Sequence, residues 1–282
     1  MTNYELKKAV ASDINEIFVK HEINEEIKPE DIDIIQDVII DAHKGERVSK
    51  LIIENIWPSI NKAKVYHYTT LDTAQKIIKT KKFRFYNIAK RFSDNEIVQF
   101  YNTHGLSDHI EDKKKYLEII PNLYYASFTD AGICMSTSDE DYLWSSFAPY
   151  NGVRLTFEIT ATSSNSDFRK IYYENDNEPI PIIMDFLNTF KEKYNLKFSL
   201  SRNSRMCAFY LKGEDYSREK ELRIVFKKWG TKDLSDTTNL SDKFVEITLG
   251  ENNLGYKIDI LDWHSRDPQD VPCKDIPFTL RT

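Results

Sequence analysis

From residue 64 onward, short strand-like segments are mixed irregularly with a few helical ones, and this pattern limits the fold more than any other feature of the chain. The segments are rich in β-branched and aromatic residues, which is typical of strands. Because strands and helices do not alternate regularly, the pattern argues against a doubly wound parallel sheet. We expect an α+β domain over residues 63–282, in which a curled mixed sheet is flanked by helices.

Within this region, hydrophobic periodicity predicts individual elements. The expected strands are Val65–Tyr68, Phe83–Tyr86, Ile133–Ser136, Val153–Ile159, Lys170–Tyr173, Leu222–Phe226 and Phe244–Leu249. The expected helices are Leu71–Lys79, Asp94–Tyr101, Lys113–Ile119 and Ile182–Tyr194. The polar stretch 231–242 is expected to be a hairpin or loop.

Residues 1–62 predict a small N-terminal helical region. In the run 29–45, apolar residues recur at spacings of three and four, Pro29 is typical of a helix start, and Gly45 of a stop. A second amphipathic run, 48–56, ends before Pro58. We favour a helical layer that covers the main domain over a partner-binding or helix-turn-helix module.

Composition excludes several classes of protein. The net charge of −6 does not favour general nucleic-acid binding, although a local basic stretch is still compatible with it. Cys134, Cys207 and Cys273 show no CxxC spacing, so neither a disulfide framework nor a zinc site is expected. No apolar run is long enough to span a bilayer, and the polar start lacks a signal peptide. We therefore expect a cytoplasmic protein without a metal and without a membrane partner.

The segment YHYTT at 66–70 raises the first functional question. On a strand, His67 and Thr69 share one face and the two tyrosines share the other. An imidazole and a hydroxyl two residues apart are suited to hold a ribose or an amide edge. Spacing alone nevertheless favours a buried histidine whose ring bonds a backbone carbonyl. Thr70 is expected to cap the helix that begins at Leu71.

The segment EKELRIVF at 219–226 places Glu219, Glu221 and Arg223 on one face of a strand and apolar residues on the other. Paired carboxylates suit reactions in which positive charge develops on a sugar carbon, because a fixed anion stabilises that charge. In isolation, a charged sheet surface with an ion pair is the better interpretation.

Two further segments carry weaker signals. In 134–144 (CMSTSDEDYLW), hydroxyl residues allow a ligand to approach the backbone, but Ser136 or Ser138 also suits a helix N-cap with Trp144 in the core. In 79–92, cations are interleaved with aromatic residues, as in surfaces that bind phosphates and stack bases. A solvated helix end followed by an edge strand is the more frequent explanation of such a run.

In order along the chain, these segments resemble a bacterial family known only as a domain of unknown function. The resemblance covers roughly residues 64–250 and rests on 66–69 (YHYT), 82–85 (KFRF), 134–136 (CMS), 143–144 (LW), 152–157 (GVRLTF) and 219–223 (EKELR). That family looks like a branch of the ADP-ribosyltransferase superfamily, whose fold is a split, curved pair of small sheets that grip NAD.

The resemblance implies roles for individual residues. His67 and Thr69 would hold the ribose next to nicotinamide, and Ser136 would support the pocket, with the strand 126–129 (ASFT) as the other candidate for that position. Glu221 would be the catalytic acid, and Glu219 would orient the acceptor. The candidates for the ring that stacks on nicotinamide are Tyr68, Tyr86 and Tyr142, and Arg223 is the nearby cation.

The resemblance therefore implies an ADP-ribosyltransferase that uses NAD as substrate, needs no metal, and modifies a macromolecular acceptor, either protein or nucleic acid. A toxin, antiviral-defence or regulatory role is the expected setting, with an antitoxin or regulatory partner bound through the N-terminal helices. The alternative is a non-catalytic nucleotide- or partner-binding module on the same scaffold. A tight pair between Arg223 and Glu221 would favour that module, because the carboxylate would then be unavailable for catalysis.

Overall fold

The computed structural model describes residues 2–42, 46–88, 96–106, 123–163, 167–174, 178–200, 202–227 and 244–266. These residues belong to two compact units. Unit 1 takes the described residues within Met1–Pro58, Phe92–Tyr116 and Tyr172–Gly213, and unit 2 those within Ser59–Arg91, Leu117–Ile171 and Glu214–Thr282. The chain thus returns to unit 1 twice, whereas the sequence analysis expected a single boundary near residue 62.

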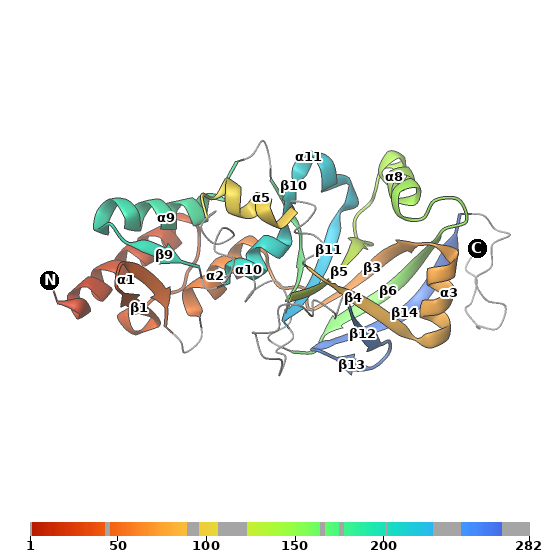
Figure 1. The fold of residues 1–282 in the computed structure, drawn as a ribbon, viewed down its shortest axis with the longest axis horizontal. Coiled ribbons are helices and arrows are strands. Elements are labelled where there is room, and N and C mark those ends of the chain that lie inside the picture. Colours follow the sequence, from red (N-terminus) through yellow and green to blue (C-terminus); the bar gives the residue numbers. More distant parts are fainter. Residues whose placement is uncertain are drawn as a thin grey trace, which may run out of the picture. The chain divides into compact units, whose positions relative to one another are not determined.

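Unit 1 combines helices with two small sheets (Figure 1). Its helices are α1 (Asn3–Lys20), η1 (Pro29–Asp31), α2 (Arg47–Ile56), α5 (Glu96–Thr103), α9 (Pro181–Tyr194), α10 (Asn203–Met206) and η3 (Cys207–Phe209). Its strands are β1 (Ile32–Ile35), β2 (Val38–Asp41), β8 (Tyr172–Glu174), β9 (Lys197–Ser199) and β10 (Tyr210–Lys212). The strand order is β1-β2-β9 in one sheet, and β10 pairs with β8 in the other.

The helix expected over residues 29–45 is wrong, because most of this run forms the β1–β2 hairpin. Ile35 pairs with Val38 across a two-residue turn, and Gln36 has a positive φ of 57° that interrupts a right-handed helix. The run is rich in isoleucine, whose branched side chain fits a strand better than a helix. The second expected helix is confirmed as α2.

Unit 2 is built on one large sheet with helices against it. Its strands are β3 (Lys62–Thr69), β4 (Lys82–Asn87), β5 (Leu123–Asp130), β6 (Val153–Ala161), β7 (Asp167–Lys170), β11 (Glu221–Lys227), β12 (Phe244–Thr248), β13 (Asn252–Asn253) and β14 (Tyr256–Ser265). Its helices are α3 (Leu71–Thr80), α8 (Thr137–Phe147) and η4 (Ser217–Glu219). The short helix α11 (Gly213–Tyr216) joins the last part of unit 1 to η4.

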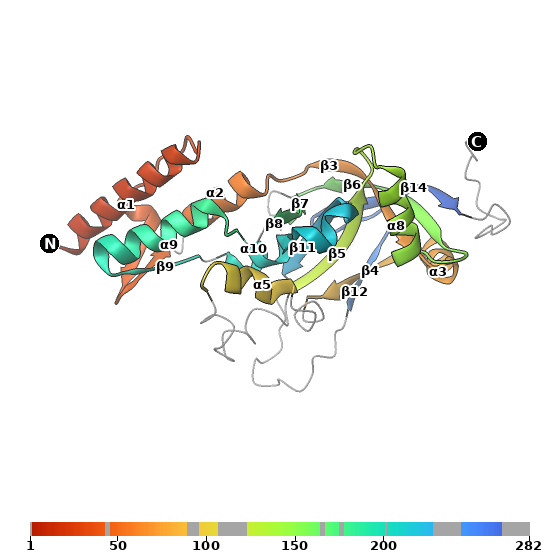
Figure 2. The ribbon, with the colours of Figure 1, turned by 90° about the horizontal axis from the view of Figure 1, so that it is seen from above.

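The pairing in this sheet is antiparallel, and the main path runs β12-β4-β5-β3-β6-β14-β13. Strand β11 pairs with the edge of β5 opposite to β3 and β4, and β7 pairs with the far edge of β11. Figure 2 shows β3, β6 and β14 beside one another, and β4 beside β12. The expected α+β class is confirmed at this level.

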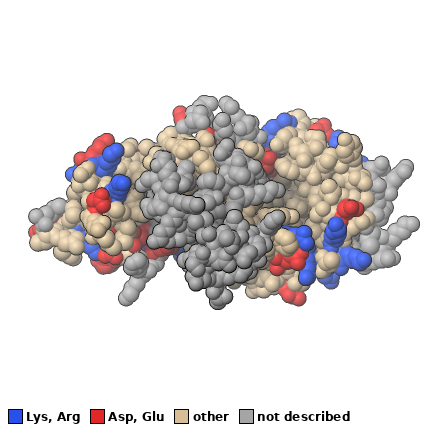
Figure 3. All heavy atoms as spheres, viewed as in Figure 1, with Lys and Arg blue, Asp and Glu red and all other residues tan. Residues whose placement is uncertain are grey.

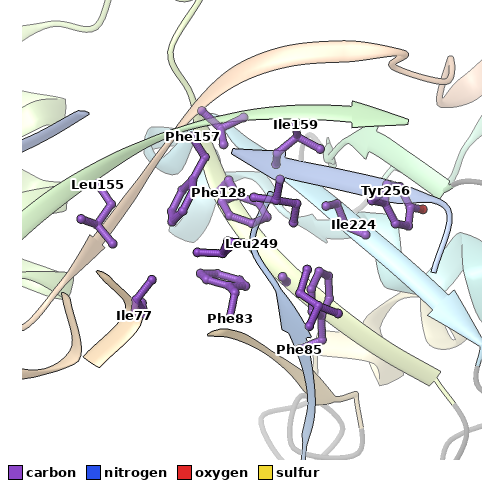
Figure 4. Close-up of a cluster of buried hydrophobic side chains, with 14 of the residues drawn as sticks. Ile77, Phe83, Phe85, Phe128, Leu155, Phe157, Ile159, Ile224, Leu249 and Tyr256 are labelled. Carbon is purple, nitrogen blue, oxygen red and sulfur yellow. The ribbon is translucent and has the colours of Figure 1, made fainter. Parts of the chain in front are cut away.

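The core of unit 2 lies on one face of the sheet. Phe83 and Phe128 stack with ring centroids 5.5 Å apart, and Phe157 meets Phe83 edge-on at the same distance (Figure 4). Helix α3 closes the cluster by burying Ala74 and Ile77 against it. Burial of this many apolar side chains is the main force that holds the sheet together.

Most of the elements expected after residue 64 are confirmed, with two wrong strands. The expected strand Lys170–Tyr173 is divided, because Lys170 ends β7 in unit 2 and Tyr172 begins β8 in unit 1. Residues 133–136 form no strand, because the chain turns after Asp130, where the Gly132 N–H donates to the Asp130 carboxylate at 2.8 Å. The expected helix Lys113–Ile119 and the expected polar loop 231–242 lie outside the described residues. Strands β5 and β14 were not among the expected ones, although Ala126–Thr129 was considered as an alternative.

Candidate functional site

The sheet of unit 2 forks at β5. Strands β3 and β5 pair only at Val65↔Asp130 and Tyr66↔Thr129, although β3 pairs with β6 along its whole length. Strand β4 joins the same edge of β5 further along, at Tyr86↔Tyr125. We call the place where β3 and β5 separate the fork. It divides the sheet into a β3–β6–β14 part and a β5–β11–β7 part, whose strands pair with each other only at this short contact.

One face of the sheet at the fork is lined with polar and aromatic side chains and is covered by α8. Tyr66, Thr129 and Glu221 are direct neighbours on adjacent strands, so their side chains share this face. Tyr68, two residues along β3, meets the ring of Trp144 on α8 edge-on at 5.1 Å. We call this side of the sheet the α8 face.

Helix α8 is positioned by its N-terminal turn. Ser136 is its N-cap, and the Ser136 hydroxyl accepts a hydrogen bond from the Asp139 N–H at 3.2 Å. Trp144 is buried in the cluster that also holds Tyr68 and Leu143. The capping interpretation of this segment is therefore confirmed, and the Ser136 side chain serves the helix end.

Arginines from two other elements tie the first turn of α8 to the rest of unit 2. Arg154 on β6 pairs with Glu140 at 2.9 Å, and its guanidinium lies 4.3 Å from the Tyr66 ring centroid. Arg218 on η4 pairs with Asp139 at 3.0 Å and lies over the Tyr142 ring. Hydrogen bonds from Arg218 and Ser136 lower the pKa of Asp139. Each guanidinium thus makes an ion pair and a cation–π contact at once.

Three buried polar atoms next to the fork lack a hydrogen-bond partner among the described residues: Tyr68 Oη, Ser127 Oγ and Arg154 Nε. The Arg154 guanidinium lies near enough to the Tyr68 hydroxyl to oppose the rise in pKa that burial causes, yet the two groups lack hydrogen-bond geometry. Ser127 lies two residues before Thr129 on β5, hence on the same face. Buried polar groups are nearly always satisfied, so a set of three indicates a place for water or for ligand atoms.

Glu221 lies on β11, across β5 from Tyr66, and an ion pair with Arg223 holds it in place. The Arg223 Nε and Nη2 atoms donate to the two Glu221 oxygens at 2.8 and 3.0 Å, and both residues are only 2% exposed. On the next strand, Arg169 makes an equivalent pair with Asp167, and Arg169 is the direct neighbour of Arg223. The Glu221 carboxylate is therefore held in place, with both oxygens engaged.

Glu219, the other acid of the pair, lies at the end of η4. Its carboxylate accepts a hydrogen bond from the Tyr142 hydroxyl at 3.4 Å. Burial of Tyr142, followed by the charge of Glu219, raises the pKa of this phenol. The structure thus brings Tyr68, Tyr142, Glu219 and Glu221 to the α8 face.

His67 lies on the opposite face, contrary to the expectation that it shares a site with Glu221. Its ring packs against Phe83, Phe128 and Phe157 with centroids 5.2, 6.0 and 6.4 Å away. Desolvation lowers its pKa to about 4, opposed by a hydrogen bond with the Ser127 backbone. The physical reason is register: Tyr66, and not His67, is the β3 residue level with Thr129 and Glu221.

Two other residues that were expected to contact the ligand, Thr69 and Tyr86, do not lie under helix α8. Thr69 is buried at the end of β3 on the same face as His67. Tyr86 is 46% exposed on β4 and pairs with Phe244 of β12. Thr70 caps α3 as expected, and its hydroxyl accepts from the Thr73 N–H at 3.3 Å.

Within the described ranges, no group of His, Cys, Asp and Glu side chains has the arrangement of a metal site. Over the same part of the chain, no helix is long and apolar enough to cross a membrane.

Comparisons with protein-family models, curated proteins and solved structures gave no match to this chain. The resemblance to ADP-ribosyltransferases therefore rests on the motif residues named above.

Tyr66 and Arg154 were not among the candidate residues expected from sequence, and Ser127 entered only through the alternative strand 126–129. Tyr66 and Arg154 lie within motifs that the resemblance used, so strand alternation could have placed both opposite the apolar face. Ser127 had a weaker signal, a single small polar residue in the apolar run LYYASF of β5.

Proposed function

We propose that unit 2 binds NAD at the fork on its α8 face and transfers ADP-ribose to a macromolecular acceptor. The observation that carries this proposal is the set of buried polar atoms without partners, Tyr68 Oη, Ser127 Oγ and Arg154 Nε. A dinucleotide offers hydroxyls, amides and phosphates that would satisfy all three. The split of the sheet into two parts joined at a short contact is the form that the resemblance implies for a fold that grips NAD.

The surrounding residues fit such a ligand. Tyr66, Tyr68 and Tyr142 offer aromatic rings for flat groups, since all three belong to or pack against the cluster under α8. Arg154 supplies a cation that Glu140 only partly neutralises in a half-buried position. In this arrangement Tyr66 takes the position on β3 that the sequence analysis gave to His67.

In a transferase, the role left for Glu221 is electrostatic, because Arg223 engages both of its oxygens. In ADP-ribosyl transfer, the bond between the ribose carbon and nicotinamide breaks, the electron pair leaves with nicotinamide, and the acceptor nucleophile bonds to the same carbon and loses a proton. Positive charge develops on the ribose as the bond breaks, and a fixed carboxylate stabilises it without reorganising. Because Arg223 binds both Glu221 oxygens, we assign Glu221 this role and not that of a general base.

A second candidate is a non-catalytic nucleotide-binding module at the same fork, and the Glu221–Arg223 pair favours it. A buried carboxylate with a bidentate guanidinium partner can be purely structural. Both candidates need the same ligand site, and they differ only in whether the glycosidic bond is broken.

The test is to measure NAD binding and nicotinamide release by the purified full chain, with and without cell lysate as a source of acceptor. Glu221→Gln keeps the size of the side chain and removes its charge, so a transferase should retain NAD binding and lose nicotinamide release by about 100-fold or more. Glu30→Gln, a change at an exposed acid in unit 1, is the matched control and should behave as wild type.

Three outcomes separate the candidates. Release that disappears in Glu221→Gln and persists in Glu30→Gln supports the transferase. NAD binding that Tyr68→Phe weakens, without release by the wild type, supports the binding module. No NAD binding by the wild type at millimolar concentration contradicts both.

A further inference from the structure

The outward side of the β4–β12 pair carries exposed aromatic and basic side chains. Along β4, Phe83 and Phe85 point into the core, while Lys82, Arg84 and Tyr86 alternate to the outside. Tyr86 pairs with Phe244 of β12, and these rings are 46% and 38% exposed. We call Lys82, Arg84, Tyr86, Phe244 and Glu246 the β4–β12 platform.

The platform continues into a basic surface. Arg84 lies 4.2 Å from the Phe244 ring centroid and pairs with Glu246 at 3.0 Å. Segments 76–86 and 244–248 together contain five cations (Lys76, Lys79, Lys81, Lys82 and Arg84) and one acid, in a chain whose net charge is −6. All five cations are exposed. Figure 3 shows Lys and Arg side chains, with Asp and Glu side chains among them, over the end of unit 2 where α3 and the β4–β12 pair lie.

The platform lies on the same side of the sheet as the fork. Tyr86 pairs directly with Tyr125 of β5, so the two side chains share a face. The guanidinium of Arg223 lies 5.2 Å from the Tyr125 ring centroid, which identifies that face as the one that carries Glu221. From Tyr125, Thr129 at the fork is four residues further along β5, or roughly 13 Å.

We propose that the β4–β12 platform binds single-stranded nucleic acid, and that this strand is the acceptor of the proposed ADP-ribosyl transfer. Exposed aromatic rings stack on unpaired bases, and neighbouring lysines and arginines bind the phosphates. A duplex keeps its bases stacked and offers nothing to Tyr86 and Phe244. In the transfer, a nucleophilic atom of a base displaces nicotinamide from the ribose carbon and releases its proton to solvent. The acceptor role rests on the proposed function, whereas binding to the platform does not.

The experiment is fluorescence anisotropy with labelled single-stranded oligonucleotides and the matching duplex, without NAD, at several salt concentrations. The full chain should bind single strands more tightly than duplex. Tyr86→Ala with Phe244→Ala should weaken binding by about tenfold or more, because two stacking positions are lost. Lys79→Gln with Lys82→Gln should reduce the slope of log affinity against log salt by about 1.4, as two phosphate contacts disappear.

Lys50→Gln with Lys191→Gln removes the same charge from exposed positions of unit 1 and should leave binding and its salt slope unchanged. No single-strand binding, equal or tighter duplex binding, or full binding after loss of Tyr86 and Phe244 would overturn the platform. The lysine variant changes only solvated side chains, so it tests the surface even where the aromatic variant fails to fold.

The two proposals fail separately. Platform-dependent binding without nicotinamide release overturns the transferase and its acceptor, and leaves the platform standing. Nicotinamide release without nucleic-acid binding overturns the platform and leaves the transferase with another acceptor.

Discussion

The two faces of strand β3 lie in very different environments. On one face, His67 packs against Phe83, Phe128 and Phe157 and makes a hydrogen bond with the Ser127 backbone. On the other face, its neighbours Tyr66 and Tyr68 meet arginine, tryptophan and buried hydroxyls. The apolar face keeps its histidine neutral and satisfied, whereas polar atoms on the α8 face have no hydrogen-bond partner among the described residues.

This difference shows which face is built for stability and which for binding. Apolar packing stabilises the fold and leaves little room for a polar ligand, so the His67 face resembles an ordinary core. Unsatisfied buried polar atoms lower stability unless water or a ligand pairs with them. Three of the five such atoms among the described residues lie on the α8 face, and this is the reason to expect the ligand there.

The largest expected change in stability comes from breaking the Glu221–Arg223 pair. Arg223→Met leaves the buried Glu221 carboxylate without its guanidinium, and we expect the free energy of unfolding to fall by about 3–5 kcal/mol. Urea unfolding followed by tryptophan fluorescence measures this change. The double variant Glu221→Met, Arg223→Met should lose less than the sum of the single variants, because it leaves no unpaired charge. A loss below about 1 kcal/mol in Arg223→Met would show that the pair does not hold the α8 face together.

The second test concerns His67 and pH. Its folded pKa of about 4 is below the ordinary value of 6.5, so the unfolded chain binds a proton in this window and the folded chain does not. Stability should therefore be complete above pH 6.5 and fall as the pH decreases towards 4, by at most about 3 kcal/mol from this residue. His67→Phe should remove this component while the carboxylate contributions stay common to both proteins. Parallel stability–pH curves for the two proteins would contradict the apolar environment of His67.

The third test uses the unpaired hydroxyl of Tyr68. Tyr68→Phe removes only that hydroxyl, so the free energy of unfolding should stay the same or rise by about 1 kcal/mol. If the hydroxyl binds the ligand, the Kd for NAD should rise by about tenfold, the value of one hydrogen bond in a desolvated site. Calorimetry gives the Kd and urea unfolding the stability. The control is Tyr150→Phe, because Tyr150 is 93% exposed. A stability loss without change in Kd would mean that Tyr68 belongs to the fold alone.

The faces of single strands were predictable from sequence, but the relation between strands was not. Alternation correctly separated His67 from Tyr66 and Tyr68, and Glu221 from Leu222, because it depends only on the neighbours of each residue. Whether His67 or Tyr66 lies level with Glu221 depends on the register of β3 and β11 with β5, which was not among the expected strands. A shift by one residue exchanges the two faces.

The same limit explains the errors in local structure. Residues 32–41 contain apolar positions that fit a helix and a hairpin equally well, and the hairpin is completed by β9, which is distant in sequence. By contrast, helices with strong local signals were predictable, such as α3 with its Thr70 cap and α9 with Pro181 in its first turn. The candidate site depends on pairing between strands that are distant in sequence. The kinds of residue at the site could therefore be predicted, but not which individual residues lie together.

The smallest expected change in stability concerns Ser136, and it separates a role in capping α8 from a role in binding the ligand. Ser136→Ala removes the acceptor for the Asp139 N–H at the start of α8, and the free energy of unfolding should fall by about 1 kcal/mol. Ser136→Gly should lower the free energy of unfolding by only about 0.3 kcal/mol, because glycine is itself tolerated at an N-cap. Both variants should bind NAD as wild type does, since the hydroxyl is already engaged by the helix. A large loss of NAD binding in both, with stability unchanged, would return Ser136 to the site and widen the ligand-binding surface to the N-terminus of α8.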